Sequence, residues 1–195
     1  MTNVRIDVVD NGGQWTHREW RMLRDLDIET NIIPNTTQPR EIKADALVLS
    51  GGAPRIGSET LKLGLTGDYL DKLSIPILGI CVGHQFIALH HGGKAGPAKV
   101  PEYGKAELIV TNPDDLFKGL PERFTVWESH NDEIYELPQG FSSLARSKDC
   151  EIEAMKHDSR PLYGVQFHPE VEHTDFHYEI FENFIEIVRS FKESK

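Results

Sequence analysis

The sequence is poor in cysteine and contains no long hydrophobic run. Its two cysteines, Cys81 and Cys150, are too few for the disulfide framework of a secreted protein, so we expect a reducing, cytoplasmic location. Whether they form a disulfide depends on a distance that the sequence does not supply. No apolar segment approaches the roughly 20 residues that cross a bilayer, and the first residues alternate in polarity like a strand. We therefore expect neither a membrane span nor a signal peptide.

Basic residues are also scarce. Lysine and arginine total 21 against 31 aspartates and glutamates, which gives a formal net charge of −10. Such a surface repels phosphate backbones and gains little from counterion release, so no nucleic-acid partner is expected. The sequence shows no repeat, linker or low-complexity segment. Its 195 residues, 38% of them hydrophobic, predict one globular domain over residues 1–195.

The first half of the sequence alternates short apolar runs with longer mixed segments, which is the pattern of βα units that build a parallel sheet. The run 46–49 is apolar throughout, as in a strand covered on both faces. The expected strands of this half are residues 4–9, 29–33, 46–49 and 75–80, and the expected helices are residues 15–26, 68–73 and 84–91.

The second half predicts strands more than helices. Short alternating runs indicate strands at 108–110, 124–128, 152–155 and 162–167. Apolar residues then recur at helical spacing up to Phe191, which predicts a final helix with Thr174 as its N-cap. The whole pattern predicts an α/β fold of three layers: a mostly parallel central sheet, helices on both faces and an extension of mixed strands.

Cys81 is the first candidate for chemistry. In Gly79-Ile80-Cys81-Val82-Gly83 it stands between two glycines where an expected buried strand meets a helix. This is the cysteine form of a nucleophile elbow, a strained turn that lifts the nucleophile out of the sheet. The helix N-terminus favours the thiolate. The alternative is a buried cysteine at the end of a core strand.

His168 and Glu170 form the second candidate. They follow an apolar strand two positions apart, and Pro169 holds His168 in the extended region, so both side chains project to the same side. A carboxylate there accepts the imidazole N–H and makes the histidine a competent base for a thiol. The alternative is a strand-end histidine paired with a surface acid.

The segments Gly79 to Gln85 and Gly164 to Val171 resemble the two signature segments of class I, triad-type glutamine amidotransferases, and the likeness covers nearly the whole chain. The resemblance implies the flavodoxin-like fold of that family. It also implies that Cys81 attacks the side-chain amide of glutamine, that His168 is the base and then the acid toward ammonia, and that Glu170 orients the histidine.

The resemblance also implies the remaining site residues. Ser50-Gly51-Gly52 resembles the family's oxyanion loop, so the N–H groups of Gly52 and Val82 would hold the tetrahedral oxygen. Ala53 departs from the proline that often follows the two glycines in that family. The residues implied to bind the α-amino and carboxylate groups of glutamine are Gln85, Ser129, His130, Asn131 and Asp132.

Two segments, Val126 to Asp132 and Pro169 to Thr174, resemble the glutaminase part of GMP synthases. In that branch a synthetase half, an ATP pyrophosphatase, adenylates xanthosine monophosphate and accepts the ammonia. The resemblance therefore implies glutamine as substrate, a partner in the form of a separate synthetase subunit, ATP and magnesium on that partner, and no cofactor in this chain. The alternatives are a glutaminase for an anthranilate-type or carbamoyl-phosphate-type acceptor, a non-catalytic regulatory module, and a cysteine hydrolase acting on peptides or γ-glutamyl conjugates.

Two further features receive ordinary interpretations. His173 and His177 have the spacing of metal ligands on a helix, but no third ligand is evident in the sequence, so no metal site is expected. We expect Trp15 and Trp20 to pack in the core.

Overall fold

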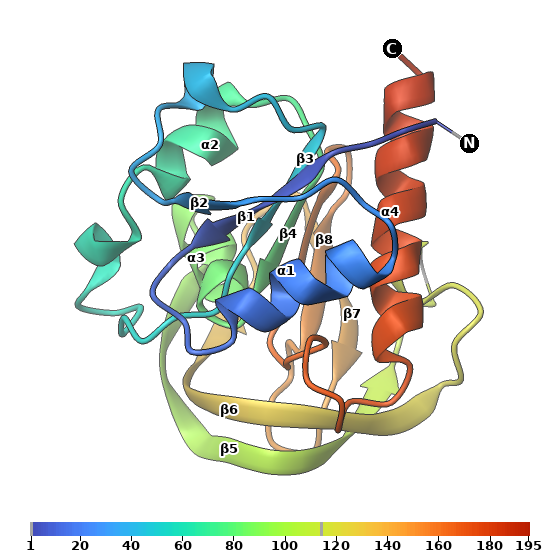
Figure 1. Ribbon diagram of the computed structural model, residues 1–195. Coiled ribbons are helices and arrows are strands. Elements are labelled where there is room, and N and C mark those ends of the chain that lie inside the picture. The colour runs from blue at the N-terminus through green and yellow to red at the C-terminus, as the bar shows by residue number, and fades with distance from the viewer. Residues whose placement is uncertain (1, 114) are drawn as a thin grey trace.

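A nine-stranded sheet organises the computed structural model, which describes residues 2–113 and 115–195 (Figure 1). Five neighbouring strands are parallel, in the order β2-β1-β3-β4-β9. This order is that of flavodoxin-like folds, as predicted. The strands are β2 (Ile32–Pro34), β1 (Ile6–Asp10), β3 (Ala46–Leu49), β4 (Ile77–Ile80) and β9 (Leu162–Val165).

Antiparallel strands extend the sheet beyond β9. Their order is β8 (Ala154–His157), β7 (Phe141–Arg146), β5 (Lys94–Val110) and β6 (Arg123–Glu136). β5 and β6 form a long ribbon that curves beneath the rest of the molecule in Figure 1. The mixed extension is confirmed, although the ribbon is far longer than the strands predicted at 108–110 and 124–128.

Helices cover both faces of the sheet and close two hydrophobic cores. On one face α1 (Thr16–Asp25) and α4 (His177–Glu193) pack against side chains such as Val8 and Val48. On the other, α2 (Thr66–Lys72) and α3 (Val82–His90) pack against the alternate residues Val9 and Leu49. Adjacent strand residues point to opposite faces, so these strands are buried on both sides and read as unbroken apolar runs. The three-layer α/β prediction is confirmed.

The predicted cap of the last helix is wrong. Phe176, in the left-handed region at φ 56°, occupies the N-cap position of α4. The Thr174 hydroxyl instead accepts a 2.9 Å hydrogen bond from the Trp127 N–H and donates one of 2.8 Å to the His168 carbonyl. The polar side chain therefore joins β6 to the loop after β9 rather than starting the helix.

Other predicted bounds also differ. β7 was not predicted, because Ser142 and Ser143 interrupt the apolar alternation of this strand. α3 begins at Val82 rather than at residue 84, directly after Cys81. Short 3₁₀ turns at Pro39–Glu41, Thr60–Leu63 and Asp115–Phe117 complete the connections. Within the described residues, no helix has both the length and the apolar character that a membrane span requires.

Candidate active site

A cavity of about 290 Å³ lies at the carboxyl ends of the parallel strands. Loops after β1, β3, β4 and β9 meet there, beside the point between β1 and β3 where the strand order reverses. Ligands of open α/β sheets bind at such switch points. The lining residues are Gly12, Gly13, Gln14, Trp15, Thr16, Glu19, Gly51, Gly52, Ala53, Cys81, Ser129, His168 and Glu170.

Cys81 occupies a strained turn between β4 and α3. Its backbone is in an unusual region for a non-glycine residue, at φ 51° and ψ −107°, and its N–H donates to the Val165 carbonyl at 2.8 Å. Such strain persists only where the surroundings impose it. The turn places the thiol at the N-terminus of α3 and at the cavity wall, as the elbow pattern predicts.

The flanking glycines make room for this turn. A Cβ on Gly83 would lie 2.4 Å from the Leu49 carbonyl oxygen, and one on Gly79 would lie 2.6 Å from the Gly83 carbonyl carbon. Both obstacles are backbone atoms, which cannot rotate away. The first turn of α3 therefore packs directly on β3 and β4, and only glycine fits at these two positions.

His168 and Glu170 form a buried pair beside the cysteine. Nδ1 of His168 lies 2.7 Å from Glu170 Oε1. Burial alone disfavours the imidazolium, but the Glu170 carboxylate and the Cys81 thiol outweigh it and raise the pKa of His168 well above its ordinary value. Because Glu170 engages Nδ1, the other ring nitrogen remains for proton exchange with Cys81.

Gly51 lies beside both the Cys81 and the His168 side chains. A Cβ at this position would lie 3.3 Å from His168 Cε1 and 3.6 Å from Cys81 Cβ. The structure therefore brings Cys81, His168 and Glu170 together at one cavity, in the arrangement of an activated thiol.

The loop after β3 lies beside the elbow. Gly52 lines the cavity, and a Cβ there would lie 3.1 Å from Val82 Cγ1. Within the described residues, neither the Gly52 nor the Val82 N–H donates a hydrogen bond, so both remain available to a ligand. Ala53 also lines the cavity, so the departure from the family pattern leaves this loop at the site.

Glu19 was missed by sequence reasoning. This α1 residue is only 1% exposed, and its Oε1 accepts a 3.2 Å hydrogen bond from the Gly51 N–H. Burial, with the nearby Glu170 charge, raises the pKa of Glu19 well above its ordinary value. A glutamate in the middle of an amphipathic helix carries no sequence signal for this position. Its contact follows only from how α1 packs on the β3 loop.

Of the residues expected to bind glutamine, only Ser129 lines the cavity. The Gln85 amide donates to the Asp132 carbonyl at 2.6 Å and to Gln166 Oε1 at 3.0 Å. The Asp132 carboxylate is held by Arg55 in an ion pair of 2.6 Å, and Asn131 is exposed. His130 is buried and faces a group of glutamates. Gln85, Asn131, Asp132 and His130 therefore lie outside the cavity wall, as does Val82, and their roles stay predictions.

The structure also places the remaining aromatic, histidine and cysteine residues that were singled out in the sequence. Trp15 was expected in the core but lines the cavity, and its ring meets that of His168 edge-on at 4.5 Å, so that prediction is wrong. The His173 ring packs on Trp127 at 4.9 Å, and His177 Nδ1 donates to the Thr174 carbonyl at 3.1 Å. Cys81 and Cys150 are both free.

The fold and this geometry together define a class of enzyme that attacks acyl groups with a cysteine nucleophile. A model of the family "Glutamine amidotransferase class-I" matches residues 7–188. This chain belongs to that family.

Relatives of known name cover nearly the whole chain. A glutamine-hydrolyzing GMP synthase subunit of Thermoplasma acidophilum is 53% identical over 97% of this chain and 96% of its own length. The subunit of the same name from Thermococcus kodakarensis is 51% identical over 93% of this chain and 97% of its own.

Solved structures agree with the fold. A crystal structure of a GMP synthase subunit from Thermoplasma acidophilum superposes with a TM-score of 0.94 at 52% identity and covers 99% of this chain and 98% of that one. A glutamine amidotransferase from Thermotoga maritima, at 21% identity and a TM-score of 0.73, covers 100% of this chain and 86% of that one and shares the fold.

Proposed function

We propose that this chain is the glutamine-hydrolysing subunit of a two-subunit GMP synthase. The observation that carries the proposal is the convergence of Cys81, His168 and Glu170 on one cavity in a chain that is 53% identical to a glutamine-hydrolyzing GMP synthase subunit. The triad supports glutamine hydrolysis, and the similarity over the whole chain supports GMP synthesis as the use of the ammonia.

The first half-reaction forms a thioester. The thiol proton of Cys81 passes to His168, and the sulfur attacks the side-chain carbonyl carbon of glutamine. The oxygen of the tetrahedral intermediate accepts hydrogen bonds from the N–H groups of Gly52 and Val82. In such sites each donor stabilises the transition state by about 3 kcal/mol. His168 then protonates the amide nitrogen, the C–N bond breaks and ammonia leaves. The Glu170 carboxylate stabilises the imidazolium during this transfer.

The second half-reaction returns the enzyme to its starting state. Neutral His168 takes a proton from water, the resulting hydroxide attacks the γ-glutamyl thioester, and the C–S bond breaks to give glutamate. The imidazolium proton returns to the Cys81 sulfur. The balance is one glutamine and one water converted into one glutamate and one ammonia.

The acceptor chemistry belongs to another chain in this proposal. A separate ATP pyrophosphatase subunit binds ATP, magnesium and xanthosine monophosphate and uses the ammonia, while this chain needs no cofactor for hydrolysis. The resemblance to GMP synthases supports such a partner, as does the fact that the relatives are named as single subunits of that enzyme. The scarcity of cysteine is consistent with a cytoplasmic location.

The test measures ammonia release and GMP formation by the wild type and by Cys81→Ala. Each is assayed alone and with a GMP synthetase subunit, ATP, magnesium and xanthosine monophosphate. Cys150→Ala is the matched control, because Cys150 is buried away from the cavity lining. We expect glutamine-dependent GMP formation that is lost in Cys81→Ala and kept in the control.

Other outcomes separate the alternatives. Glutamine hydrolysis that ignores the synthetase would leave a glutaminase with another acceptor. Hydrolysis of γ-glutamyl conjugates but not of free glutamine would indicate a different cysteine hydrolase. No turnover that depends on Cys81 under any condition would leave a regulatory module.

A further inference from the structure

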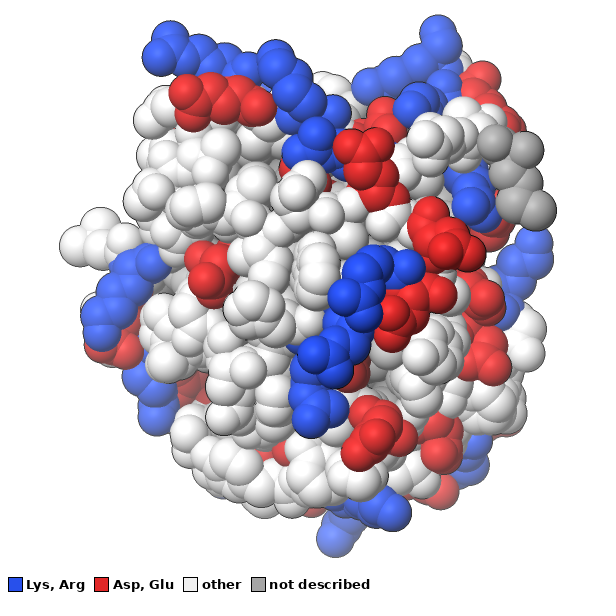
Figure 2. All heavy atoms as spheres, viewed as in Figure 1, with Lys and Arg blue, Asp and Glu red and all other residues white. Residues whose placement is uncertain are grey.

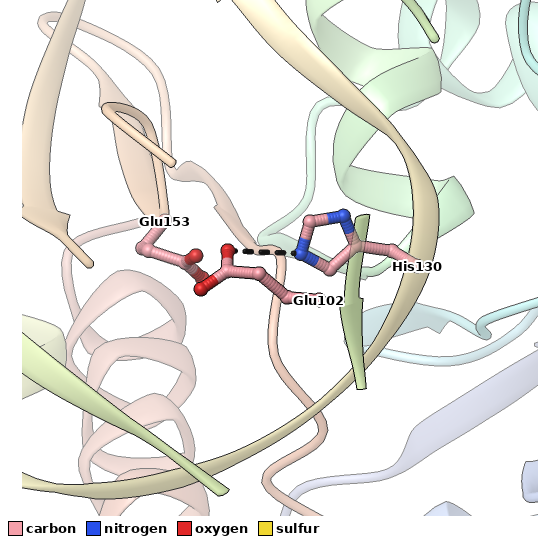
Figure 3. A group of neighbouring side chains, drawn as sticks. All are labelled: Glu102, His130 and Glu153. Carbon is pink, nitrogen blue, oxygen red and sulfur yellow. Dashed lines mark ion pairs between the residues drawn. The ribbon is translucent and has the colours of Figure 1, made fainter. Parts of the chain in front are cut away.

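A second group of ionisable side chains lies outside the catalytic cavity. Figure 3 shows Glu102, His130 and Glu153 pointing toward one another. Glu102 comes from β5, His130 from β6 and Glu153 from the residue before β8. Glu128, two positions before His130 on β6, joins them on the same side of the strand, with an oxygen 3.4 Å from His130 Nε2. Three elements of the mixed extension thus converge here.

The carboxyl groups of this cluster are buried with few hydrogen-bond donors. Glu128 is 1% exposed and Glu153 is 0% exposed, and no backbone N–H or hydroxyl group of the described residues donates to either. Their hydrogen-bond neighbours are each other and, for Glu153, the Cys150 thiol. Glu102 accepts from the Ser147 hydroxyl at 3.0 Å and has one oxygen 3.3 Å from His130 Nε2. Buried carboxylates without a compensating positive group are costly by several kcal/mol each.

The histidine is oriented like a metal ligand. Its Nδ1 lies 3.0 Å from the Asp132 carbonyl, which can only accept, so Nδ1 carries the hydrogen of the neutral ring. Nε2 is then the nitrogen that faces the carboxylates, 3.3 Å from Glu102 and 3.4 Å from Glu128. Metal-binding histidines have this arrangement, with the outer nitrogen donating to a backbone carbonyl and the inner one free for the ion.

Three carboxyl groups and an imidazole nitrogen face one point, where either a bound cation or protons must neutralise them. The ligand atoms of Glu102, His130 and Glu153 lie within 4.8 Å of one another. Four-coordinate ions at bond lengths of about 2.0–2.2 Å hold their ligands roughly 3.5 Å apart, so small side-chain rotations suffice. Carboxylate and imidazole ligands suit Zn²⁺ and Mn²⁺.

We propose that Glu102, His130 and Glu153 bind one divalent transition-metal ion, with Glu128 as a further oxygen ligand. The ion joins the β5–β6 ribbon to the chain entering β8. Since Ser129, between Glu128 and His130, lines the catalytic cavity, the site anchors the strand that forms that wall. Its role is structural, and it takes no part in the thioester chemistry.

A surface cleft gives access to the group. This cleft, of about 440 Å³, is lined by Glu102 and Glu128 together with Tyr103, Lys105 and Lys148. Neither lysine forms an ion pair with the three glutamates among the described residues, so the cleft supplies no competing internal cation. The cleft therefore leads from solvent to the edge of the group at Glu102 and Glu128.

The experiment uses the whole chain, freed of any affinity tag and stripped with a chelator. Mn²⁺ binding is followed by the paramagnetic resonance of the free ion, and Zn²⁺ binding by competition with a chromophoric chelator. The variant is Glu153→Gln. The matched control is Glu107→Gln, an exposed glutamate on the same strand as Glu102 that lines the same cleft.

We expect one equivalent of metal in the wild type and the control, and binding at least 10-fold weaker in Glu153→Gln. Glu128→Gln, measured alongside, is expected to weaken binding in the same direction. Metal should also raise the Tm of the wild type and the control but not of Glu153→Gln. The proposal is overturned if the stripped wild type binds neither ion, or if Glu153→Gln binds the metal as tightly as the wild type. In either case protons, rather than a metal ion, neutralise the carboxyl groups.

Discussion

At the scale of single residues, Glu19 has the most unusual setting. It is a carboxyl group inside the wall of the catalytic cavity, close to the Glu170 charge, and it accepts the Gly51 N–H. By accepting from this N–H, Glu19 fixes the Ser50–Gly51 peptide at the start of the loop that is predicted to hold the oxyanion. A neutral carboxyl group performs this task as well as a carboxylate, because it accepts through its carbonyl oxygen.

Glu19→Gln is expected to make stability less dependent on pH. The raised pKa means that the folded protein binds more protons than the unfolded chain from about pH 4.3 up to the folded-state pKa. The free energy of unfolding of the wild type therefore decreases as the pH rises through that window. Glutamine keeps the acceptor for Gly51 and never ionises.

The measurement is Tm by circular dichroism at pH 4, 6 and 8. The Tm of Glu19→Gln should rise relative to that of the wild type as the pH rises. The Tm of the control Glu182→Gln, at an exposed position, should equal that of the wild type at each pH. A wild type that becomes more stable than Glu19→Gln at pH 8 would contradict the assignment.

At the scale of elements, the junction of β4 and α3 sets the site. Replacing Gly83 by alanine improves helix propensity by about 1 kcal/mol. The added Cβ, however, would meet the Leu49 carbonyl at 2.4 Å, and overpacking of this kind costs about 1–3 kcal/mol. Because the obstacle is a backbone atom that cannot rotate away, we expect the cost of the clash to exceed the gain in helix propensity.

Urea unfolding should therefore show Gly83→Ala to be less stable than the wild type by up to about 2 kcal/mol. Gly57→Ala is the control, since a Cβ there meets nothing within 4 Å. It should change stability by no more than about 0.5 kcal/mol. Equal stability of the two variants would show that α3 can shift away from β3.

The loop after β9 depends on Thr174. Its hydroxyl links the Trp127 N–H to the His168 carbonyl. Thr174→Val removes both hydrogen bonds at nearly constant shape, and Thr174→Ser keeps them. We expect kcat for glutamine hydrolysis to fall at least 10-fold in the valine variant and to remain near wild type in the serine variant. A similar loss in both would trace the effect to the methyl group instead.

Local signals explain which elements were predictable. β3 and β4 are unbroken apolar runs between turn residues, and the cysteine between glycines and the histidine two positions before a glutamate are short local patterns. The full length of the β5–β6 ribbon escaped prediction because much of 94–107 is exposed and pairs through its backbone, so polar and apolar residues do not alternate there. Glu19 and Trp15 reach the cavity through tertiary packing, for which the sequence has no local sign.

At the scale of the whole molecule, one sheet connects all parts of the chain. Two hydrophobic cores share its strands, with alternate residues of β1 and β3 contributing to opposite faces. Charges of both signs are scattered over the face seen in Figure 2, with acidic groups beside many of the basic ones. The cores, rather than surface ion pairs, therefore hold the fold together.

This continuity predicts a single unfolding transition. Leu70→Ala disturbs the core on one face and Phe181→Ala the core on the other. Each should lower stability by about 2–5 kcal/mol. Circular dichroism and tryptophan fluorescence should give coincident curves in the wild type and in both variants. Two separated transitions would divide the chain and contradict the prediction of one domain over residues 1–195.

The edge contact between Trp15 and His168 gives the enzyme an internal optical probe. The centroids of the indole and imidazole rings lie 4.5 Å apart, so a change of charge on the imidazole is expected to change the emission of the indole. With Trp20 and Trp127 replaced by phenylalanine, the remaining Trp15 fluorescence is expected to report the charge on His168. In the proposed mechanism each turnover moves a proton onto this ring and off again, so the intrinsic emission is expected to follow the reaction without a label.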